Sequence, residues 1–249
     1  MTMADRIALA FVAIVLLTMP VFAVLSRGRP VDADVARRPT TVLLGFWIRD
    51  WAMWILGPTE RALVRWKVSP DVFNYLGAVF GLFAGVAFYF GELSVAGWMI
   101  LLGGAMDIFD GRIARARNLA NARGAFLDST LDRFAETFTF AGVVMFFVNW
   151  PLALLAAVLA LGGSMLVSYA RARGEALGVS CKEGLMQRAE RLVLLALAAL
   201  FDGAVTGAGG WPEGSLLFVV VGVIAVGSLW TAAYRTGSIS QQLGPVDHE

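Results

Sequence analysis

The chain has almost none of the residues on which thiol and imidazole chemistry depends. Its 249 residues include one cysteine, Cys181, and one histidine, His248. A disulfide within the chain needs two cysteines, so none can form. Catalysis by a histidine base, by a Cys/His pair or at a histidine-ligated zinc ion is therefore not expected.

Charge is also scarce. Charged residues make up 16% of the sequence and hydrophobic residues 58%, with a mean hydropathy of +0.71. This leaves too little polar surface for a water-soluble globule, and the long apolar runs exclude a disordered chain. The sequence predicts an all-α, polytopic integral membrane bundle. The formal net charge of +1 says little about partners, and we expect no nucleic-acid partner.

Seven apolar runs are candidates for membrane-spanning helices. They cover about residues 7–25, 69–90, 94–109, 125–148, 151–170, 192–201 and 214–234. The first run resembles a signal peptide, but its length and the lack of a small-residue cleavage pattern favour a retained anchor. We therefore predict four parts: an N-terminal anchor (1–26), an interfacial segment (27–68), a six-helix catalytic membrane domain (69–235) and a cytoplasmic tail (236–249).

The segment between the first two apolar runs is rich in arginine and tryptophan. Its part TTVLLGFWIRDWAMWILGPTERALVRWKV has the composition of an amphipathic helix lying in the membrane interface. A short buried helix is the alternative, because such helices overlap with interfacial ones in length.

Basic residues gather at alternate ends of the apolar runs. Residues 27–67 carry eight Lys/Arg, 112–123 carry four and 171–191 carry five, whereas the connections at 91–94, 149–151 and 202–214 carry none. The positive-inside rule then predicts an N-terminus outside and a cytoplasmic C-terminus. IFDG at 108–111 and LFDG at 200–203 echo each other, and we interpret the second copy, at the bare external end, as an ordinary turn.

The stretch MDIFDGRIARARNLANARGAFLDSTLDRF, residues 106–134, contains four aspartates and five arginines. On one helix Asp107 and Asp110 fall on a shared face, and on a second helix Asp128 and Asp132 follow at i, i+4 spacing. A loop this short makes the two helices antiparallel neighbours. The four carboxylates can therefore converge at the cytoplasmic end of the pair.

Carboxylates held together near a membrane need a cation between them, since each left unpaired costs roughly 2.5–3.5 kcal/mol. Oxygen ligands without histidine or cysteine suit Mg²⁺ or Mn²⁺, and four carboxylates can hold two ions. Gly111 and Gly124 let a bulky ligand approach the backbone, and Arg115 offers a charge to a phosphate. The alternative is that the aspartates are solvated caps or salt-bridge partners. The arginines that could neutralise them are Arg112, Arg117, Arg123 and Arg133.

The complete spacing Asp107-x-x-Asp110-Gly111-x-x-Ala114-Arg115, then eight residues, then Gly124-x-x-x-Asp128-x-x-x-Asp132 resembles the signature of the CDP-alcohol phosphotransferase family. The resemblance covers roughly residues 65–235. It implies a six-helix membrane enzyme, a homodimer in a bacterial or archaeal cell membrane. Such an enzyme cleaves the pyrophosphate of a CDP-linked lipid such as CDP-diacylglycerol, releases CMP and joins the phosphoryl group to an alcohol.

The resemblance also implies roles for individual residues. Asp107, Asp110 and Asp128 would be metal ligands, and Asp132 would be both a ligand and the general base on the acceptor hydroxyl. The CDP site would be lined by Gly111, Ala114, Arg115 and Gly124.

The acceptor must be inferred from a second basic cluster, SYARARGEALGVSCKEGLMQRAERL at 168–192. An anionic acceptor suits these arginines, whereas the positive-inside rule explains Lys182. The stretch resembles phosphatidylinositol phosphate synthases and their archaeal ether-lipid relatives, although Gly174 and Gln187 depart from their pattern. The predicted acceptor-phosphate residues are Arg171, Arg173, Arg188 and Arg191.

Inositol 1-phosphate is therefore the predicted acceptor, with glycerol 3-phosphate as the alternative. A different class of function, an intramembrane cation transporter, would place acids near the middle of the membrane on helices broken by glycine or proline.

Overall fold

The computed structural model describes residues 3–28, 30–32, 35–36, 45–181 and 183–244. Helices account for the regular structure of these ranges, and no strand occurs in them, which confirms the all-α prediction. Their bounds are α1 Met3–Leu25, α3 Phe46–Arg65, α4 Pro70–Tyr89, α5 Leu93–Ala116, α6 Ala122–Phe146, α7 Pro151–Ala176, α8 Arg188–Gly209 and α9 Ser215–Leu243. The predictions on Lys182, on residues 29, 33–34 and 37–44 of the interfacial segment and on tail residues 245–249 lie outside the described residues.

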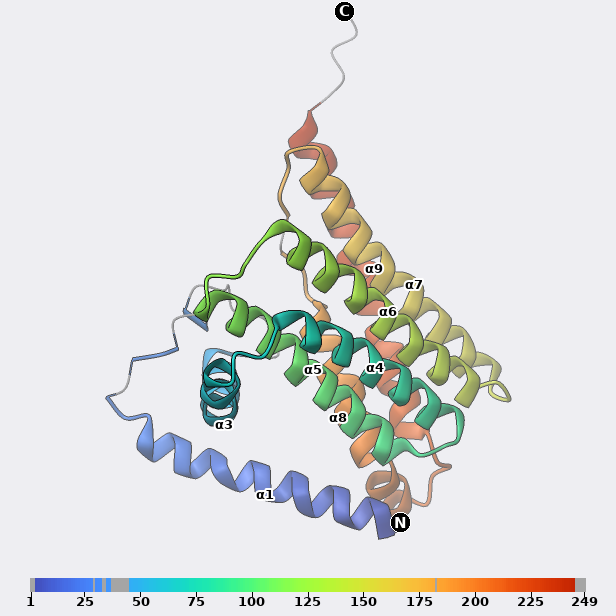
Figure 1. Cartoon of the computed structure of the whole chain (residues 1–249). Coiled ribbons are helices and arrows are strands. Elements are labelled where there is room, and N and C mark those ends of the chain that lie inside the picture. Colours follow the sequence, from blue (N-terminus) through green and yellow to red (C-terminus); the bar gives the residue numbers. More distant parts are fainter. Residues whose placement is uncertain (1–2, 29, 33–34, 37–44, 182, 245–249) are drawn as a thin grey trace, which may run out of the picture.

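Helices α4 to α9 form the six-helix bundle that the sequence predicts (Figure 1). Five of them, α4, α5, α7, α8 and α9, are long and apolar enough to cross a membrane. Helix α6 has 25 residues but carries charged side chains along its first half. It nevertheless packs between α4 and α7 inside the bundle, so it belongs to the same membrane core.

Several helices extend beyond the apolar runs that predicted them. Helix α5 continues to Ala116 although its apolar run ends near residue 109, and α9 continues to Leu243, past the predicted domain boundary at 235. Helix α8 begins at Arg188, where Gln187 and Glu190 form a capping box. The helical backbone thus persists where the side chains become polar, because its own hydrogen bonds do not depend on them.

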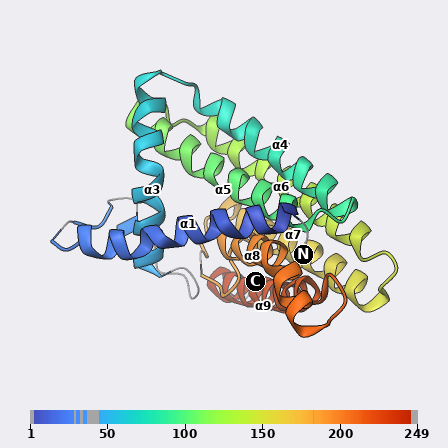
Figure 2. The same cartoon turned by 90° about the horizontal axis from the view of Figure 1, so that it is seen from below.

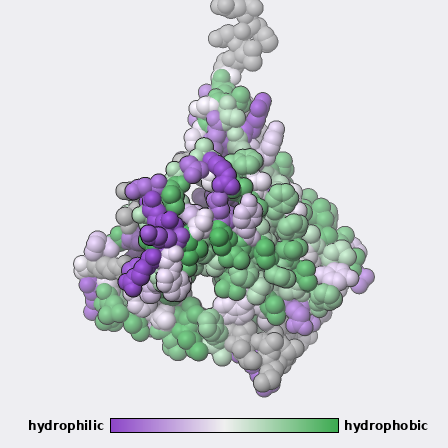
Figure 3. All heavy atoms as spheres, in the orientation of Figure 1, coloured by the Kyte–Doolittle hydropathy of each residue, from purple (hydrophilic) through white to green (hydrophobic). Residues whose placement is uncertain are grey.

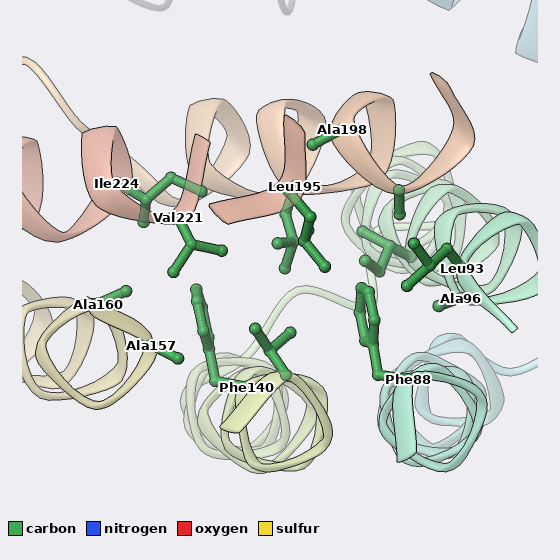
Figure 4. Packing of buried hydrophobic residues seen from close by; sticks show 14 of the residues in the cluster. Phe88, Leu93, Ala96, Phe140, Ala157, Ala160, Leu195, Ala198, Val221 and Ile224 are labelled. Atoms are coloured by element: carbon green, nitrogen blue, oxygen red, sulfur yellow. The ribbon is translucent and has the colours of Figure 1, made fainter. Parts of the chain in front are cut away.

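The core lies between two layers of helices and combines aromatic with very small side chains. Phe88 of α4 and Phe140 of α6 point towards α8 and α9, where Leu195 and Val221 meet them (Figure 4). Alanines on α7 and α8 fill the remaining space, and small residues of this kind let membrane helices approach closely. The buried alanines are Ala153, Ala157, Ala160, Ala196, Ala198 and Ala199.

Glycines set the contact between α4 and α6. A Cβ added at Gly81 would lie 2.6 Å from the Cα of Ala135, and one added at Gly85 or Gly142 would overlap the backbone of the facing helix. Gly81 and Gly85 therefore let α4 and α6 pack closely, as small residues do between membrane helices.

Helix α1 runs beside the bundle (Figures 1 and 2). Near its start, the Phe11 ring contacts Trp98 of α5, and Val12 packs with Leu200 of α8. Near its end, Phe22 contacts Trp47 and Trp54 of α3. The apolar part of α1 covers Ala10–Leu25 and is shorter than the five spanning segments.

Helix α3 crosses the bundle rather than following it. Figure 1 shows α3 along its axis while α4, α5 and α6 run across the view, and Figure 2 shows it from the side. Its residues Leu56, Leu63 and Val64 pack on Phe109 and Ile113 of α5. The other face of α3 is exposed at Arg61 and Arg65. Trp66, which follows the end of the helix, is exposed as well. The structure therefore shows a half-buried, transverse helix, and its place in the membrane interface stays a prediction.

Hydrophilic residues gather at one end of the molecule. In the space-filling view they lie over α3 and the α5–α6 connection, whereas the flank of the bundle is mainly hydrophobic (Figure 3). We call this the basic end, because the arginine-rich stretch 112–123 lies there. The opposite end, with the connections free of Lys and Arg, is the bare end.

The prediction of an ordinary turn at LFDG, residues 200–203, is wrong. These residues lie inside α8, and the Asp202 side chain is fully buried. Its two carboxylate oxygens accept hydrogen bonds from the backbone N–H groups of Gly214, at 2.7 Å, and Leu217, at 3.0 Å. The start of α9 has unpaired N–H groups that need an acceptor, so Asp202 ties α8 to α9.

Candidate active site

The first half of the site lies on α5. Asp107 is half-buried and Asp110 is 6% exposed, one turn further along the same face. A Cβ added at Gly111 would lie 3.1 Å from the Arg115 guanidinium. The guanidinium therefore lies over the bare backbone of Gly111, with half-buried Ala114 on the same helix. The predicted residues of α5 thus stand together.

The second half lies on α6. The Asn121 side chain accepts a hydrogen bond from the Gly124 backbone N–H at 2.8 Å and begins the helix there. Asp128 and Asp132 follow on the next turns and are both half-buried. The cap thus fixes where α6 starts and on which face its aspartates stand.

Three of the four aspartates converge. One carboxylate oxygen each from Asp107, Asp110 and Asp128 lies within 4.8 Å of the other two. Carboxylates this close repel one another unless a cation lies between them. Oxygen ligands at this separation fit a hard divalent cation such as Mg²⁺ or Mn²⁺.

Asp132 stands beside this group and is held by an arginine from a third helix. Arg188, at the start of α8, lies 2.6 Å from an Asp132 oxygen and 2.8 Å from an Asp107 oxygen. One guanidinium thus joins the aspartates of α5 and α6. Arg188 was predicted to hold the acceptor phosphate, and the structure places it next to the predicted general base.

The four nearby arginines that could have neutralised the aspartates have other partners. Arg112 pairs with Asp32 and Glu60, and Arg123 pairs with Asp71. Arg117 donates to the carbonyl oxygen of Val68. Arg133 contacts Ser168 and Glu136. A different arginine, Arg188, pairs with Asp107 and Asp132, so the salt-bridge alternative applies to these two aspartates through an arginine of α8.

A small cavity of about 20 Å³ runs from the aspartates into the bundle. That is room for about one water molecule. Its polar lining comes from four helices: α4 (Asn74), α5 (Asp107, Asp110), α6 (Asp132, Glu136, Thr139) and α8 (Arg188). Neither α5 nor α6 contains a proline. Both helices are continuous, so the acids do not lie on the broken helices that a transporter of this kind would need.

Glu136 was not predicted as a site residue. It is 1% exposed and continues the Asp128–Asp132 stripe by one more i, i+4 step, a signal that the sequence did contain. Its Oε1 accepts a hydrogen bond from the Nε of Arg191 at 2.9 Å. Arg191, also 1% exposed, donates as well to the carbonyl oxygen of Met186.

The predicted acceptor arginines thus have different surroundings. Arg188 faces the aspartates and Arg191 is buried against Glu136, whereas Arg171 is exposed and pairs with Glu175 at 2.9 Å. Arg173 is exposed near the end of α7. Arg235 of α9 was not singled out; it is buried and donates to the carbonyl oxygens of Glu183 and Val167.

The sequence of the chain has curated relatives. It is 32% identical over 231 residues to the phosphatidylinositol phosphate synthase of Streptomyces avermitilis, covering 90% of this chain and 92% of the relative. It is 34% identical over 198 residues to the phosphatidylinositol phosphate synthase of Mycobacteroides abscessus, covering 78% and 87%. The archaetidylinositol phosphate synthase of Methanothermobacter thermautotrophicus is 34% identical over 136 residues, covering 55% of this chain and 68% of the relative.

Solved structures agree with these relatives. The phosphatidylinositol phosphate synthase of Mycobacterium tuberculosis with CDP-DAG bound superposes with a TM-score of 0.66 at 28% identity, covering 77% of this chain and 96% of that chain. The same enzyme in complex with manganese and citrate gives a TM-score of 0.67. The profile of the CDP-alcohol phosphatidyltransferase family matches residues 67–230. The chain therefore belongs to the CDP-alcohol phosphatidyltransferase family.

Proposed function

We propose that this protein transfers the phosphatidyl group of CDP-DAG to a phosphorylated inositol, inositol 1-phosphate, and releases CMP. The observation that carries the proposal is the convergence of Asp107, Asp110 and Asp128 beside the Asp132–Arg188 pair. The names of the relatives support the acceptor, and the CDP-DAG complex of the Mycobacterium tuberculosis enzyme supports the lipid donor.

The carboxylates would hold two divalent cations, Mg²⁺ in the cell with Mn²⁺ as a substitute. The ligands would be Asp107, Asp110, Asp128 and Asp132. The manganese complex of the Mycobacterium tuberculosis enzyme supports a divalent ion. Such ions, when bound, stabilise negative charge on a diphosphate and on the oxygen that leaves it.

The remaining signature residues would hold the CDP moiety. Arg115 covers Gly111, where a glycine allows a diphosphate close to the helix backbone and the guanidinium supplies charge-assisted hydrogen bonds. Ala114 and Gly124 add small, half-buried surfaces on the two helices, so the nucleotide can lie between α5 and α6.

The chemical step needs a base next to the acceptor. A carboxylate of Asp132 would take the proton of the acceptor hydroxyl. The acceptor oxygen then forms a bond to the lipid-side phosphorus, the bond from that phosphorus to the bridging oxygen breaks, and this oxygen leaves with CMP. Arg188, 2.6 Å from Asp132, orients the carboxylate.

Arg188 would also bind the phosphate of the acceptor, because its guanidinium stands beside the base and its side chain is 21% exposed. Arg171 and Arg173 would attract the anion from the exposed end of α7. Arg191 would act indirectly: its partner Glu136 and the Met186 carbonyl hold it inside the bundle. There it fixes the start of α8 and hence Arg188.

The protein would act as an integral membrane enzyme of a bacterial or archaeal cell, with its active site facing the cytoplasm and its N-terminus outside. The basic end, which holds the site, supports this orientation through the positive-inside rule. A homodimer is the expected assembly.

An acceptor screen tests the proposal. The purified protein in detergent receives CDP-DAG, Mg²⁺ and one of inositol 1-phosphate, glycerol 3-phosphate or free inositol, and CMP release and the mass of the lipid product are measured. We expect product with inositol 1-phosphate and loss of turnover after chelation of Mg²⁺. Product with glycerol 3-phosphate alone would replace the acceptor, and turnover that persists after chelation with EDTA would overturn the metal assignment.

A further inference from the structure

Arg112 connects the signature helix α5 to the segment that precedes the bundle. Its NH1 and NH2 donate to the two oxygens of Asp32, each at 3.0 Å, and its Nε donates to Glu60 at 2.6 Å. Each of the three side chains is about 15% exposed (15%, 15% and 16%). A two-pronged arginine–carboxylate contact that is mostly shielded from water fixes geometry as well as charge.

Arg112 points away from the aspartates. At 100° per residue, it stands about 140° from Asp107 and about 160° from Asp110 around the axis of α5. The same two turns of α5 thus present carboxylates to the bundle and Arg112 to the opposite side. The proposed metal site has no contribution from Arg112 itself.

Hydrogen bonds connect the partners of Arg112 to one another and to α1. The backbone N–H of Asp32 donates to Asp50, which is buried on α3, at 2.9 Å. The Trp51 ring N–H of α3 donates to Thr18 of α1 at 2.9 Å. We call α1, residues 30–32 and α3 the N-terminal clamp. Its position on α5 is secured at Arg112 and by the apolar contact of Leu63 and Val64 with Phe109 and Ile113.

We propose that the N-terminal clamp positions the metal-bearing turns of α5 through Arg112, which makes Arg112, Asp32 and Glu60 positioning residues for the site. The proposal rests on the proposed metal-dependent function. Metal ligands must stand within a few tenths of an ångström of their required places. A helix end held from one face only can tilt. The ion pairs of Arg112 hold α5 from the face opposite to the carboxylates. They thereby fix the rotation of α5 about its axis and its distance from α6.

The chain offers a matched control at the same end. Arg123 of α6 pairs with Asp71 of α4 at 2.7 Å, but this pair is exposed, with 70% and 33% of the side chains accessible. Exposed pairs contribute little. Arg112→Gln and Arg123→Gln thus remove one charge each from the basic end, and only the first cuts the link between the N-terminal clamp and α5.

The test measures Mn²⁺ binding to the purified full chain without substrate, from the loss of the electron paramagnetic resonance signal of free Mn²⁺. We expect Arg112→Gln to weaken binding by about three- to tenfold, a usual size for coupling through a packed element. The KM for CDP-DAG should rise in parallel while the KM for inositol 1-phosphate stays unchanged. Arg123→Gln should match the parent in all three.

Reversal of the charges adds a rescue. Arg112→Asp should weaken Mn²⁺ binding more than Arg112→Gln, because it places a third acid beside Asp32 and Glu60. Adding Asp32→Arg restores a cation between Glu60 and the new carboxylate, so the double variant should recover at least half of the loss.

Hydrogen exchange separates this proposal from the proposed function. Amides of residues 107–117 should exchange faster in Arg112→Gln than in the parent or in Arg123→Gln. If the parent binds no Mn²⁺, the metal assignment fails, and the exchange result still decides whether the N-terminal clamp holds α5. Unchanged exchange, or Mn²⁺ affinity within twofold of the parent in folded Arg112→Gln, would overturn the proposal.

Discussion

Asp110 and Asp202 stand in nearly identical tetrapeptides, IFDG at 108–111 and LFDG at 200–203, yet they differ in every partner. Both are buried, with 6% and 0% of the residue exposed. Asp202, at the bare end, receives two backbone N–H groups from the start of α9. Asp110, at the basic end, faces the carboxylates of Asp107 and Asp128.

The comparison teaches that surroundings rather than local sequence decide what a buried carboxylate does. Two backbone N–H groups stabilise the Asp202 carboxylate by hydrogen bonds, so its role is to join α8 to α9. The group around Asp110 collects negative charge from two helices, and Arg188 is the cation that bridges Asp107 and Asp132. Such a concentration of negative charge is stable only if cations bind to it.

The largest expected effect follows from removing charge at the basic end. Asp107→Asn, Asp110→Asn or Asp128→Asn should lower CMP release by about a hundredfold or more, since metal ions supply several kcal/mol of transition-state stabilisation. Asp202→Asn should keep turnover within about twofold per folded molecule, because it lies at the other end. Initial rates at saturating CDP-DAG measure both, and near-normal turnover of any of the first three variants would break the comparison.

The next largest effect is expected at the buried pair of Glu136 and Arg191. This pair lies at the basic end but outside the aspartate group. Arg191→Met should destabilise the protein by up to roughly 3–5 kcal/mol, because it removes the buried partner of the Glu136 carboxylate and leaves only Arg133 to balance that charge. Thermal unfolding in detergent reports this loss. Adding Glu136→Gln should restore much of the stability, and a double variant as unstable as the single one would show that Arg191 acts mainly through other contacts.

A smaller effect is expected at Arg188, which sharpens the division between binding the acceptor and binding the lipid. Arg188→Gln should raise the KM for inositol 1-phosphate by about ten- to a hundredfold, the value of a lost charge-assisted contact. Free inositol, which lacks the phosphate, should be affected much less. Equal losses for both acceptors would assign Arg188 to the orientation of Asp132 alone.

The smallest effect is expected at the bare end. Asp202→Ala should lower the free energy of unfolding by about 1–2 kcal/mol, since it removes an acceptor from the N-terminus of α9. Asp202→Asn, which keeps one acceptor oxygen, should lose less. Thermal unfolding of the two variants checks this order, and a loss at Asp202→Ala larger than that at Arg191→Met would mean that the bare end depends on charge as well.

Much of the fold follows from hydropathy and helical period. The runs at 69–90 and 151–170 predicted α4 and α7, and the aspartate spacing placed the carboxylates on the right faces of α5 and α6. The run at 192–201 underestimated α8, because Arg188, Arg191 and Asp202 interrupt its apolarity while the helix continues through them.

The contacts that complete the site could not be predicted, because they join residues far apart in the chain. Arg188 reaches Asp107 across 81 positions, and Arg112 reaches Asp32 across 80. Nothing in the local pattern distinguishes Arg188 from Arg191, although one faces the aspartates and the other is buried against Glu136. The rotation of α8 where it packs on α5 and α9 decides between them.

The most direct test of the account is Mn²⁺ binding to the parent protein, Asp110→Asn and Asp202→Asn in the absence of substrate. Titration followed by the free-ion resonance signal gives an affinity for each. We expect the same affinity for the parent and Asp202→Asn and a loss of at least about tenfold for Asp110→Asn. Equal binding by Asp110→Asn and the parent would contradict the assignment of the aspartate group as a metal site.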